Sequence, residues 1–266
     1  MQLLNRLSVV ALLLTAWRPA TADAADLAAV KARGSLRVLA VRMKQADEFF
    51  QLQGRPGFDR EILEGFAKLH GLRLEPVPVS GWDELVPALV ADRGDVIAGR
   101  FTVTEERKQK IAFTRETFPT RNVVLTRAPT PPVKSLEDLR ALRVGTIAGS
   151  SMAEAVARAG VPASNVDDGV KPGGLPAALV SGRVKAVVLG VESAITAHRD
   201  DPKIELGMFL GPPGSLAYGA RKQDEALVQA LDAYIENLRK TATWSRLAVK
   251  YFGESAPDIL KKARAE

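Results

Sequence analysis

The sequence predicts an α/β protein in which parallel sheets are flanked by helices. Short apolar runs typical of strands alternate with amphipathic runs typical of helices, and this alternation indicates βαβ crossovers between parallel strands. The chain has 266 residues, of which 46% are hydrophobic, and this length supports one large domain or two modest lobes. A proline cluster at Ala128-Pro-Thr-Pro-Pro132 interrupts the pattern, so we expect a lobe boundary there.

The first half of the chain alternates helices and strands with clear end signals. Gly34 ends the first helix, and Thr104 has the features of an N-cap, with acidic residues in the first turn that follows. The second helix is amphipathic, and its expected inward face is formed by Ile62, Leu63, Phe66, Ala67 and Leu69. In chain order we expect a helix at 26–33, a strand at 36–41, a loop at 42–56, a helix at 59–70, a strand at 72–79, a helix from 83, a strand at 95–98, a loop at 99–103, a helix from 105 and a strand at 121–127.

The second half repeats the alternation. A strand is followed by the turn Ala148-Gly-Ser-Ser151 and a helix that Gly160 ends. The later elements are a helix at 175–181, a buried strand at 185–189, a helix at 191–198, a strand at 204–210, a strand at 216–221 that returns to the first lobe, and helices at 225–238 and 244–251.

The N-terminus has the pattern of an export signal. Arg6 precedes an apolar run that is too short to span a bilayer, and Ala22-Asp-Ala24 fits a small-x-small cleavage site. A retained membrane anchor is the alternative. No cysteine follows the apolar run, so we expect no lipoprotein anchor. The sequence therefore predicts a signal peptide at residues 1–24 and a mature protein free in the periplasm.

Composition argues against several functional classes. The formal net charge is +6, the basic residues are scattered, and aromatic residues make up 6% of the chain, so nucleic-acid binding is not indicated. We expect neither a metal nor another cofactor. The chain has no cysteine, which is compatible with any compartment.

Two stretches suggest an anion site. Arg107 follows the loop at 99–103 by about one helical turn, where its guanidinium could hold a carboxylate beside loop amides and hydroxyls. The turn at Ser150 and Ser151 would present free amides and a positive helix end. In each case the alternative is ordinary structure, namely a surface arginine and a simple helix cap. Phe49 and Phe50 could stack on a ligand or fill the core.

Ten short pieces carry a resemblance to a known family. In chain order they are Gly34-Ser-Leu-Arg-Val38, Gly57-Phe-Asp-Arg-Glu-Ile62, Trp82-Asp-Glu-Leu-Val-Pro-Ala-Leu89, Gly94-Asp-Val-Ile-Ala-Gly99, Thr104-Glu-Glu-Arg107, Ile111-Ala-Phe-Thr114, Ser135-Leu-Glu-Asp-Leu139, Arg143-Val-Gly-Thr146, Gly182-Arg-Val184, and Tyr218-Gly-Ala-Arg-Lys222 with Trp244 and Tyr251-Phe-Gly253. Together they resemble the periplasmic amino-acid-binding proteins of ABC importers, solute-binding family 3.

The resemblance implies a two-lobed periplasmic-binding-protein fold of type II with a two-strand hinge near 122–126 and 216–220. The implied lobes are 25–124 and 216–266 for the first and 128–212 for the second. By the same resemblance, Gly99, Thr102 and the clamping Arg107 would bind a carboxylate with Ser150 and Ser151. Other candidates for ligand contact are Phe50 and Arg100, although Arg100 stands where the family has a small residue.

A departure from the family pattern concerns the ligand amine. The family's ammonium-binding aspartate would fall at Gly190, and glycine has no carboxylate. Glu192 is close enough in sequence to replace it. The alternative is a ligand with a second anionic group, which Arg42, Lys44, Arg100 and Arg107 would favour if they face the cleft.

The resemblance implies a monomeric binding protein that captures a small carboxylate-bearing ligand, an amino acid or related organic anion, and delivers it to an ABC permease. We expect no enzymatic activity. One alternative is a periplasmic dehydratase of the cyclohexadienyl or arogenate type, for which Glu192 would be the acid. Another is a ligand-sensing accessory domain.

Overall fold

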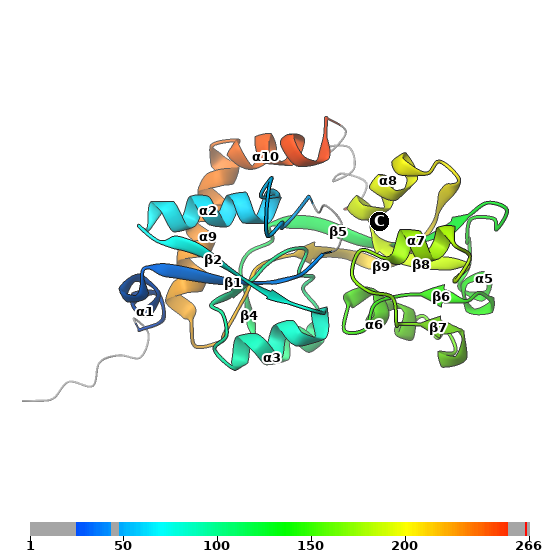
Figure 1. The fold of residues 1–266 in the computed structure, drawn as a ribbon, viewed down its shortest axis with the longest axis horizontal. Helices are drawn as coiled ribbons and strands as arrows, with labels where there is room; N and C mark the ends of the chain where they lie inside the picture. The colour runs from blue at the N-terminus through cyan, green and yellow to red at the C-terminus, as the bar shows by residue number, and fades with distance from the viewer. Residues whose placement is uncertain (1–24, 44–47, 255–263, 265–266) are drawn as a thin grey trace, which may run out of the picture.

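The computed structural model describes residues 25–43, 48–254 and 264, so the predicted signal peptide and Lys44 lie outside the described residues. Two sheets lie side by side, and helices pack on each of them (Figure 1). We call each sheet with its helices a lobe. The predicted α/β class is confirmed.

The first lobe contains the sheet with strand order β2-β1-β3-β10-β4. Its elements are α1 (Ala25–Arg33), β1 (Ser35–Val41), α2 (Phe58–Leu69), β2 (Arg73–Val79), the 3-10 helix η2 (Trp82–Glu84), α3 (Leu85–Val90), β3 (Val96–Ile97), α4 (Glu105–Lys110), β4 (Ala112–Phe113), β10 (Gly219–Ala220), α9 (Glu225–Lys240) and α10 (Thr243–Phe252).

The second lobe contains the sheet with strand order β7-β6-β8-β5-β9. Its elements are β5 (Phe118–Arg127), α5 (Leu136–Ala141), β6 (Val144–Gly145), α6 (Ser151–Arg158), the 3-10 helix η3 (Ala163–Asn165), β7 (Val166–Asp167), α7 (Leu175–Val180), β8 (Ala186–Gly190), α8 (Val191–Asp200) and β9 (Ile204–Leu216).

The sheets are mixed, whereas the sequence predicted parallel sheets. Strand β1 is parallel to β2 and β3, and β6 is parallel to β7 and β8. Strand β10 is antiparallel to both of its neighbours, and β5 is antiparallel to β8 and β9. A chain that crosses to the second lobe and then returns must enter and leave in opposite directions, which reverses the crossing strands relative to the βαβ units.

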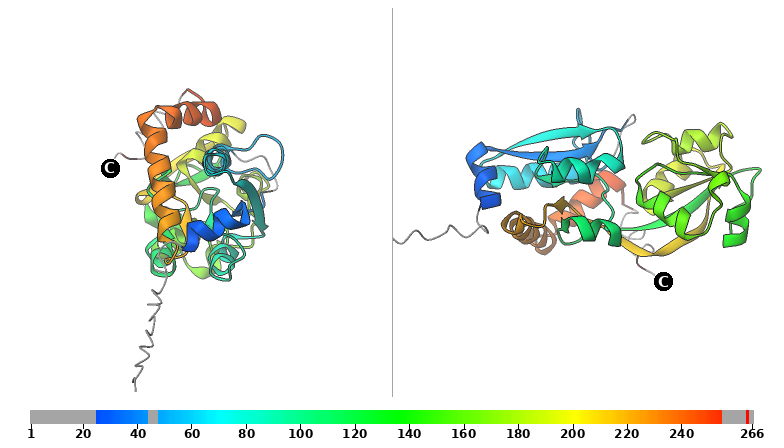
Figure 2. Two further views of the ribbon diagram at one scale, coloured as in Figure 1. Left: turned by 90° about the vertical axis from the view of Figure 1, so that its left-hand side faces the viewer. Right: turned by 90° about the horizontal axis from the view of Figure 1, so that it is seen from below.

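Strands β5 and β9 connect the two lobes (Figures 1 and 2). They pair from Phe118–Leu216 at one end to Arg127–Ile204 at the other, with a register shift between Thr120 and Asn122. The strand predicted to end at 210 continues as β9 to Leu216 and includes Pro212 and Pro213. They are tolerated because β9 is an edge strand, where a missing N–H costs no ladder bond.

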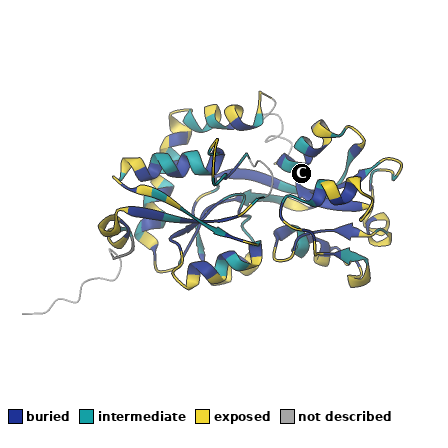
Figure 3. Ribbon diagram, viewed as in Figure 1, coloured by how far each residue is buried: buried dark blue, intermediate teal, exposed yellow. Residues whose placement is uncertain are grey.

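The buried apolar residues of the described chain form three clusters. Figure 3 shows that the strands inside each lobe are mostly buried. One cluster contains Trp82 of the first lobe and Ile147 of the second, so apolar side chains continue across the lobe boundary. Four residues of the predicted inward face of α2 are buried, but Leu69 is 68% exposed. Leu69 is the last residue of α2, where the helix ends before His70.

Candidate functional site

A cleft of about 350 Å³ lies between the lobes. The first lobe contributes Met43, Phe49, Trp82, Arg100 and Thr102 to its lining. The second lobe contributes Ser150, Ser151, Gly190, Glu192 and Ser193. Thr120 and Asn122 reach the cleft from β5. The lining therefore combines apolar walls with a few polar groups, as small-molecule sites generally do.

Of the eight predicted site residues, five line this cleft: Arg100, Thr102, Ser150, Ser151 and Glu192. The other three, Gly99, Phe50 and Arg107, lie just outside the lining. Phe50 is 3% exposed and belongs to the core of the first lobe. A side-chain carbon at Gly99 would lie 3.2 Å from the Cβ of Phe50, so these two residues pack together beneath the cleft. Phe49 is 2% exposed and belongs to the same core cluster, although it also borders the cleft, so both phenylalanines fill the core.

The turn at Ser150 and Ser151 caps helix α6 and also lines the cleft. The Ser150 Oγ accepts from the Ala153 N–H at 3.2 Å and begins α6. The Ser151 Oγ donates to the Thr102 Oγ1 at 3.0 Å, which joins the two lobes. Because α6 has eight residues and points its N-terminus at the cleft, its partial positive charge favours a negative group there.

Arg107 lies in the first turn of α4, which begins at the predicted N-cap, Thr104. The Thr104 hydroxyl accepts from the Arg107 N–H at 3.3 Å. The Arg107 guanidinium donates to the Thr102 carbonyl at 2.7 Å and the Gly149 carbonyl at 3.0 Å, and it lies 4.2 Å from the Phe101 ring centroid. Burial lowers the pKa of Arg107 to about 10, against the opposing effect of Glu154 and Glu106. The side chain is therefore charged at neutral pH and bridges the lobes through backbone carbonyls.

Glu192 occupies the space in front of Gly190. A side-chain carbon at Gly190 would lie 2.2 Å from the Glu192 Oε1, a distance no real atom pair would keep. The Glu192 side chain is buried and its Oε2 accepts from the Thr120 hydroxyl at 2.9 Å. Gly190 itself pairs with Asn122 across the sheet. A side chain at position 190 would therefore displace the Glu192 carboxylate from its present place.

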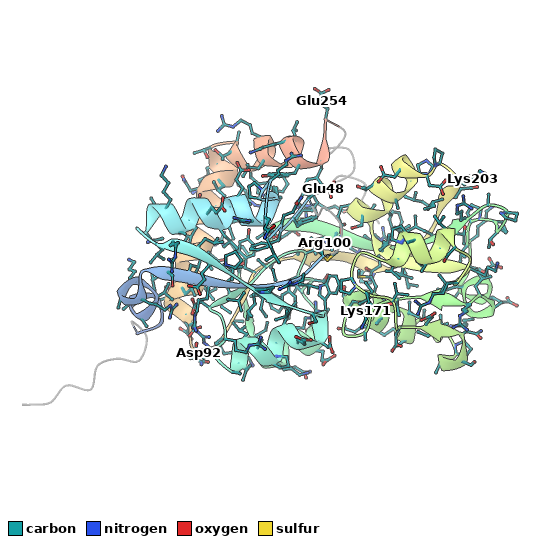
Figure 4. The ribbon with its side chains drawn as sticks, viewed as in Figure 1. Glu48, Asp92, Arg100, Lys171, Lys203 and Glu254 are labelled. Atoms are coloured by element: carbon teal, nitrogen blue, oxygen red, sulfur yellow. The ribbon has the colours of Figure 1, made fainter. Side chains whose placement is uncertain are left out.

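Arg100 reaches across the cleft from the first lobe (Figure 4). Its Nη1 donates to the Ser193 Oγ at 2.7 Å, and its Nη2 approaches the Met43 sulfur at 3.8 Å. Among the described lining residues Arg100 is the one basic side chain, and the same lining contains four acids, Glu48, Glu192, Asp200 and Asp201. One of these acids, Asp201, is paired with Arg127 at 2.7 Å.

The basic residues expected to face an anion do not gather here. Arg42 is exposed and outside the lining, and Lys44 lies outside the described residues. The Arg107 Nη1 and Nη2 atoms donate to backbone carbonyls. The condition set for a ligand with a second anionic group is therefore not met by the described residues. Arg42 directly follows the last residue of β1, and its side chain is exposed.

Sequence reasoning missed several lining residues. Trp82 begins one of the pieces that carry the family resemblance, but no ligand contact was predicted for it. Thr120 lies before the predicted start of its strand. Asn122 carried a usable signal, because it is polar within the apolar strand β5. Met43 and Ser193 carried none, since their place in the cleft depends on how the lobes meet.

The part of the chain that the structure describes indicates neither a metal site nor a membrane span. Within residues 25–43 and 48–254, no three His, Cys, Asp or Glu side chains come together as a metal ion would require. No helix in the described part of the chain is long and apolar enough to cross a membrane.

Comparison with known proteins assigns the family. Residues 46–254 match the model for bacterial extracellular solute-binding proteins, family 3. The chain belongs to this family. A probable amino-acid ABC transporter-binding protein from Haemophilus influenzae is 26% identical to this family 3 chain over 202 residues, which cover 74% of the chain and 76% of the relative. The predicted resemblance is confirmed.

A second kind of relative is a longer protein. Membrane-bound lytic murein transglycosylase F from Stutzerimonas stutzeri is 28% identical over 238 residues, which cover 86% of this chain and 48% of that protein. The family 3 chain therefore spans about half the length of this relative.

Solved structures confirm the type II periplasmic-binding-protein fold. A mutant of ArgBP from T. maritima superposes with a TM-score of 0.77 at 27% identity, covering 86% of this chain and 100% of that one. The ancestral amino acid-binding protein AncCDT-1, a precursor of cyclohexadienyl dehydratase, gives a TM-score of 0.73 at 25% identity, covering 85% and 99%.

Proposed function

We propose that this family 3 protein is a monomeric periplasmic receptor that captures a free α-amino acid between its lobes and delivers it to an ABC permease. The observation that carries the proposal is the buried Glu192 carboxylate, which fills the space left by Gly190 and faces a cleft whose opposite groups favour a carboxylate. A ligand with both an ammonium and a carboxylate matches this separation of charge. The amino-acid-binding relatives support the same class of ligand.

The two ends of such a ligand would meet different groups. Its carboxylate would lie near Arg100, Thr102 and the N-terminus of α6, where hydroxyls and helix amides favour negative charge. Its ammonium would meet Glu192 beside Thr120. The apolar lining, which includes Trp82 and Leu175, would then cover the rest of the molecule.

We prefer an amino acid to the alternative of a ligand with a second anionic group. With one lining cation among the described residues, a second carboxylate on the ligand would face Glu192 and the other lining acids without a partner. Burying an unpaired charge is unfavourable, whereas a zwitterion is matched at both ends.

A thermal-shift screen tests the proposal. Purified mature protein is melted alone and with each of the common L-amino acids, and separately with di- and tricarboxylates. An amino acid that binds only the native state adds about 2.7 kcal/mol of stability at one hundred times its Kd. We expect at least one α-amino acid to raise the melting temperature and to give a saturable calorimetric titration. Stabilisation by dicarboxylates alone would contradict the proposal.

A dehydratase of the cyclohexadienyl or arogenate type is the second candidate. It is favoured by Glu192, a buried carboxylate in a mostly apolar cleft, where a carboxyl group could protonate a leaving hydroxyl. The similarity to AncCDT-1 supports it in the same way. Incubation with prephenate or arogenate separates the two candidates, because a receptor returns the compound unchanged and a dehydratase turns it over, with loss of activity in Glu192→Gln.

The longer transglycosylase relative leaves a third candidate, a ligand-sensing module. It shares the amino-acid site with the receptor but has no permease partner. Co-purification from membranes that contain the permease encoded nearest to this protein would favour transport over sensing.

A further inference from the structure

A buried carboxylate lies beneath the turn that carries Arg100 into the cleft. Asp59, near the start of α2, is 2% exposed. Its Oδ2 accepts from the N–H groups of both Gly99 and Arg100, at 3.1 and 3.2 Å, and its Oδ1 accepts from the Tyr218 hydroxyl at 3.3 Å. A single side chain therefore joins α2, the cleft turn and the segment that follows β9.

The turn needs this support because its backbone is strained. Gly99 has a φ of 85° and Arg100 a φ of 59°. The second value is unfavourable for a residue with a Cβ, so a conformation of this kind persists only where its surroundings hold it. Two consecutive N–H groups that point to one carboxylate oxygen provide such a hold, and hydrogen bonds to a charged acceptor are stronger than neutral ones.

The conformation of the turn decides where Arg100 points. From this backbone the guanidinium reaches α8 of the opposite lobe and donates to Ser193, the residue after Glu192. An extended or right-handed φ at Arg100 would redirect its Cα–Cβ bond and withdraw the side chain from α8.

We propose that Asp59 is a positioning residue, which holds the Gly99–Arg100 turn in its left-handed conformation and thereby aims Arg100 across the cleft at Ser193. The competing explanation is purely structural. An acid near the N-terminus of α2 stabilises the helix dipole, and its loss would then weaken the first lobe as a whole.

Amide hydrogen exchange in the ligand-free protein distinguishes the two explanations. The Ala98 N–H, next to the turn, donates to the Leu39 carbonyl at 3.0 Å and serves as an internal control. In Asp59→Ala we expect exchange at Gly99 and Arg100 to accelerate by about tenfold, which corresponds to about 1.4 kcal/mol, with Ala98 unchanged. Equal acceleration at Ala98, or no acceleration at the turn, would overturn the proposal.

Matched variants sharpen this test. Asp59→Asn should retain slow exchange, because its amide oxygen can accept from both N–H groups and its NH2 can donate to Tyr218. Tyr218→Phe removes the third partner and leaves the two turn amides bonded, so exchange at Gly99 and Arg100 should stay slow. Acceleration in Tyr218→Phe as large as in Asp59→Ala would contradict direct support by Asp59. If Asp59→Ala does not fold, Asp59→Ser replaces it, since a serine hydroxyl is too short to reach both amides.

A double-mutant cycle tests whether Asp59 directs the Arg100 side chain toward Ser193. The backbone amide resonance of Ser193 should shift in Asp59→Ala and in Arg100→Gly. Adding Asp59→Ala to the Arg100→Gly background should produce no further shift, because the side chain that carries the effect is gone. Independent, additive shifts would overturn the proposal. None of these measurements requires a ligand, so their outcome does not depend on whether the protein binds an amino acid.

Discussion

The two walls of the cleft are built in different ways. On the second lobe, the polar groups lie at the starts of α6 and α8, where Ser150 caps its own helix and Glu192 lies in a first turn. On the first lobe, they lie on a loop whose left-handed backbone is held by Asp59 from another helix. Helix starts thus set the backbone of one wall, although Glu192 also accepts a long-range hydrogen bond from Thr120, whereas the backbone of the other wall is held by long-range hydrogen bonds to Asp59.

This difference has consequences for mutation. A group at a helix start keeps its direction as long as the helix forms, so the second wall should tolerate changes elsewhere in the protein. The first wall should lose its geometry when a distant partner is removed. The predictions below test this contrast, in order of decreasing effect.

The largest effect should come from Arg107→Ala. The variant removes two inter-element hydrogen bonds, to Thr102 and Gly149, together with the contact to the Phe101 ring. We expect the free energy of unfolding to fall by about 2–3 kcal/mol, measured by urea titration, and amino-acid binding to weaken, because Arg107 holds the Thr102 and Gly149 backbone on the two sides of the cleft. Arg107→Lys keeps the charge without the planar fork and should be intermediate. Wild-type stability and affinity in Arg107→Ala would contradict this supporting role of Arg107.

The second effect concerns Glu192, the acid near the position where the family has an aspartate and this chain has Gly190. Glu192→Gln should weaken amino-acid binding by about ten- to one-hundredfold, or roughly 1.4–2.8 kcal/mol, because an ammonium loses its charged acceptor. In the double variant Gly190→Asp with Glu192→Gly, the glutamate side chain that would clash with an aspartate at position 190 is gone, and the aspartate supplies the acid instead. Calorimetry should show that it binds better than Glu192→Gly alone. No recovery would indicate that Glu192 acts in another way.

A third effect concerns the approach of the lobes. A side-chain carbon at Gly149 would lie 2.6 Å from the backbone N of Asp83, which belongs to η2 in the first lobe. We therefore expect Gly149→Ala to separate the lobes and to increase the radius of gyration measured by small-angle X-ray scattering.

Gly182→Ala is the matched control for Gly149→Ala. Its φ of 75° is close to the 70° of Gly149, yet nothing lies within 4 Å of a side-chain carbon there. Both variants should lose about 1–2 kcal/mol through backbone strain. An increase in radius that is the same in both would show that the contact with Asp83 does not hold the lobes together.

The smallest effect is a pH dependence within the first lobe. Burial raises the pKa of the Glu61 carboxyl, but hydrogen bonds from Lys250 and Tyr251 outweigh it and leave that pKa below its usual 4.5. A carboxyl whose pKa is lowered by folding stabilises the protein above its unfolded pKa. This stability is lost as the pH falls from about 4.5 through the lower, folded value.

Glu61→Gln should remove that part of the acid dependence without changing the cleft. Urea midpoints measured between neutral pH and acid should converge for the variant and the wild-type protein as the pH falls. Because Glu61 is partly exposed, we expect the difference at neutral pH to be small. Curves that stay parallel down to acid would contradict a role for Glu61 in holding α10 against α2.

Local chemistry in the sequence was sufficient for much of the fold. The N-cap at Thr104 was predicted from residue type and is confirmed, and the Ser150 turn forms the helix cap that was the alternative to an anion site there, because a cap is made within three residues. The same holds for the buried face of α2, apart from Leu69. Helix α5 was missed although Ser135 and Asp138 form a capping box, a signal that was present and unused.

Only the tertiary structure decided where the polar side chains of the cleft point. Arg107 could have faced a ligand, and instead its guanidinium lies on the carbonyls of Thr102 and Gly149. Glu192 could have faced solvent, and instead it fills the space that Gly190 leaves open. The direction of Arg100 depends on a carboxylate 41 positions earlier in the chain. Each of these outcomes depends on backbone atoms brought together by folding, which no local pattern of residues describes.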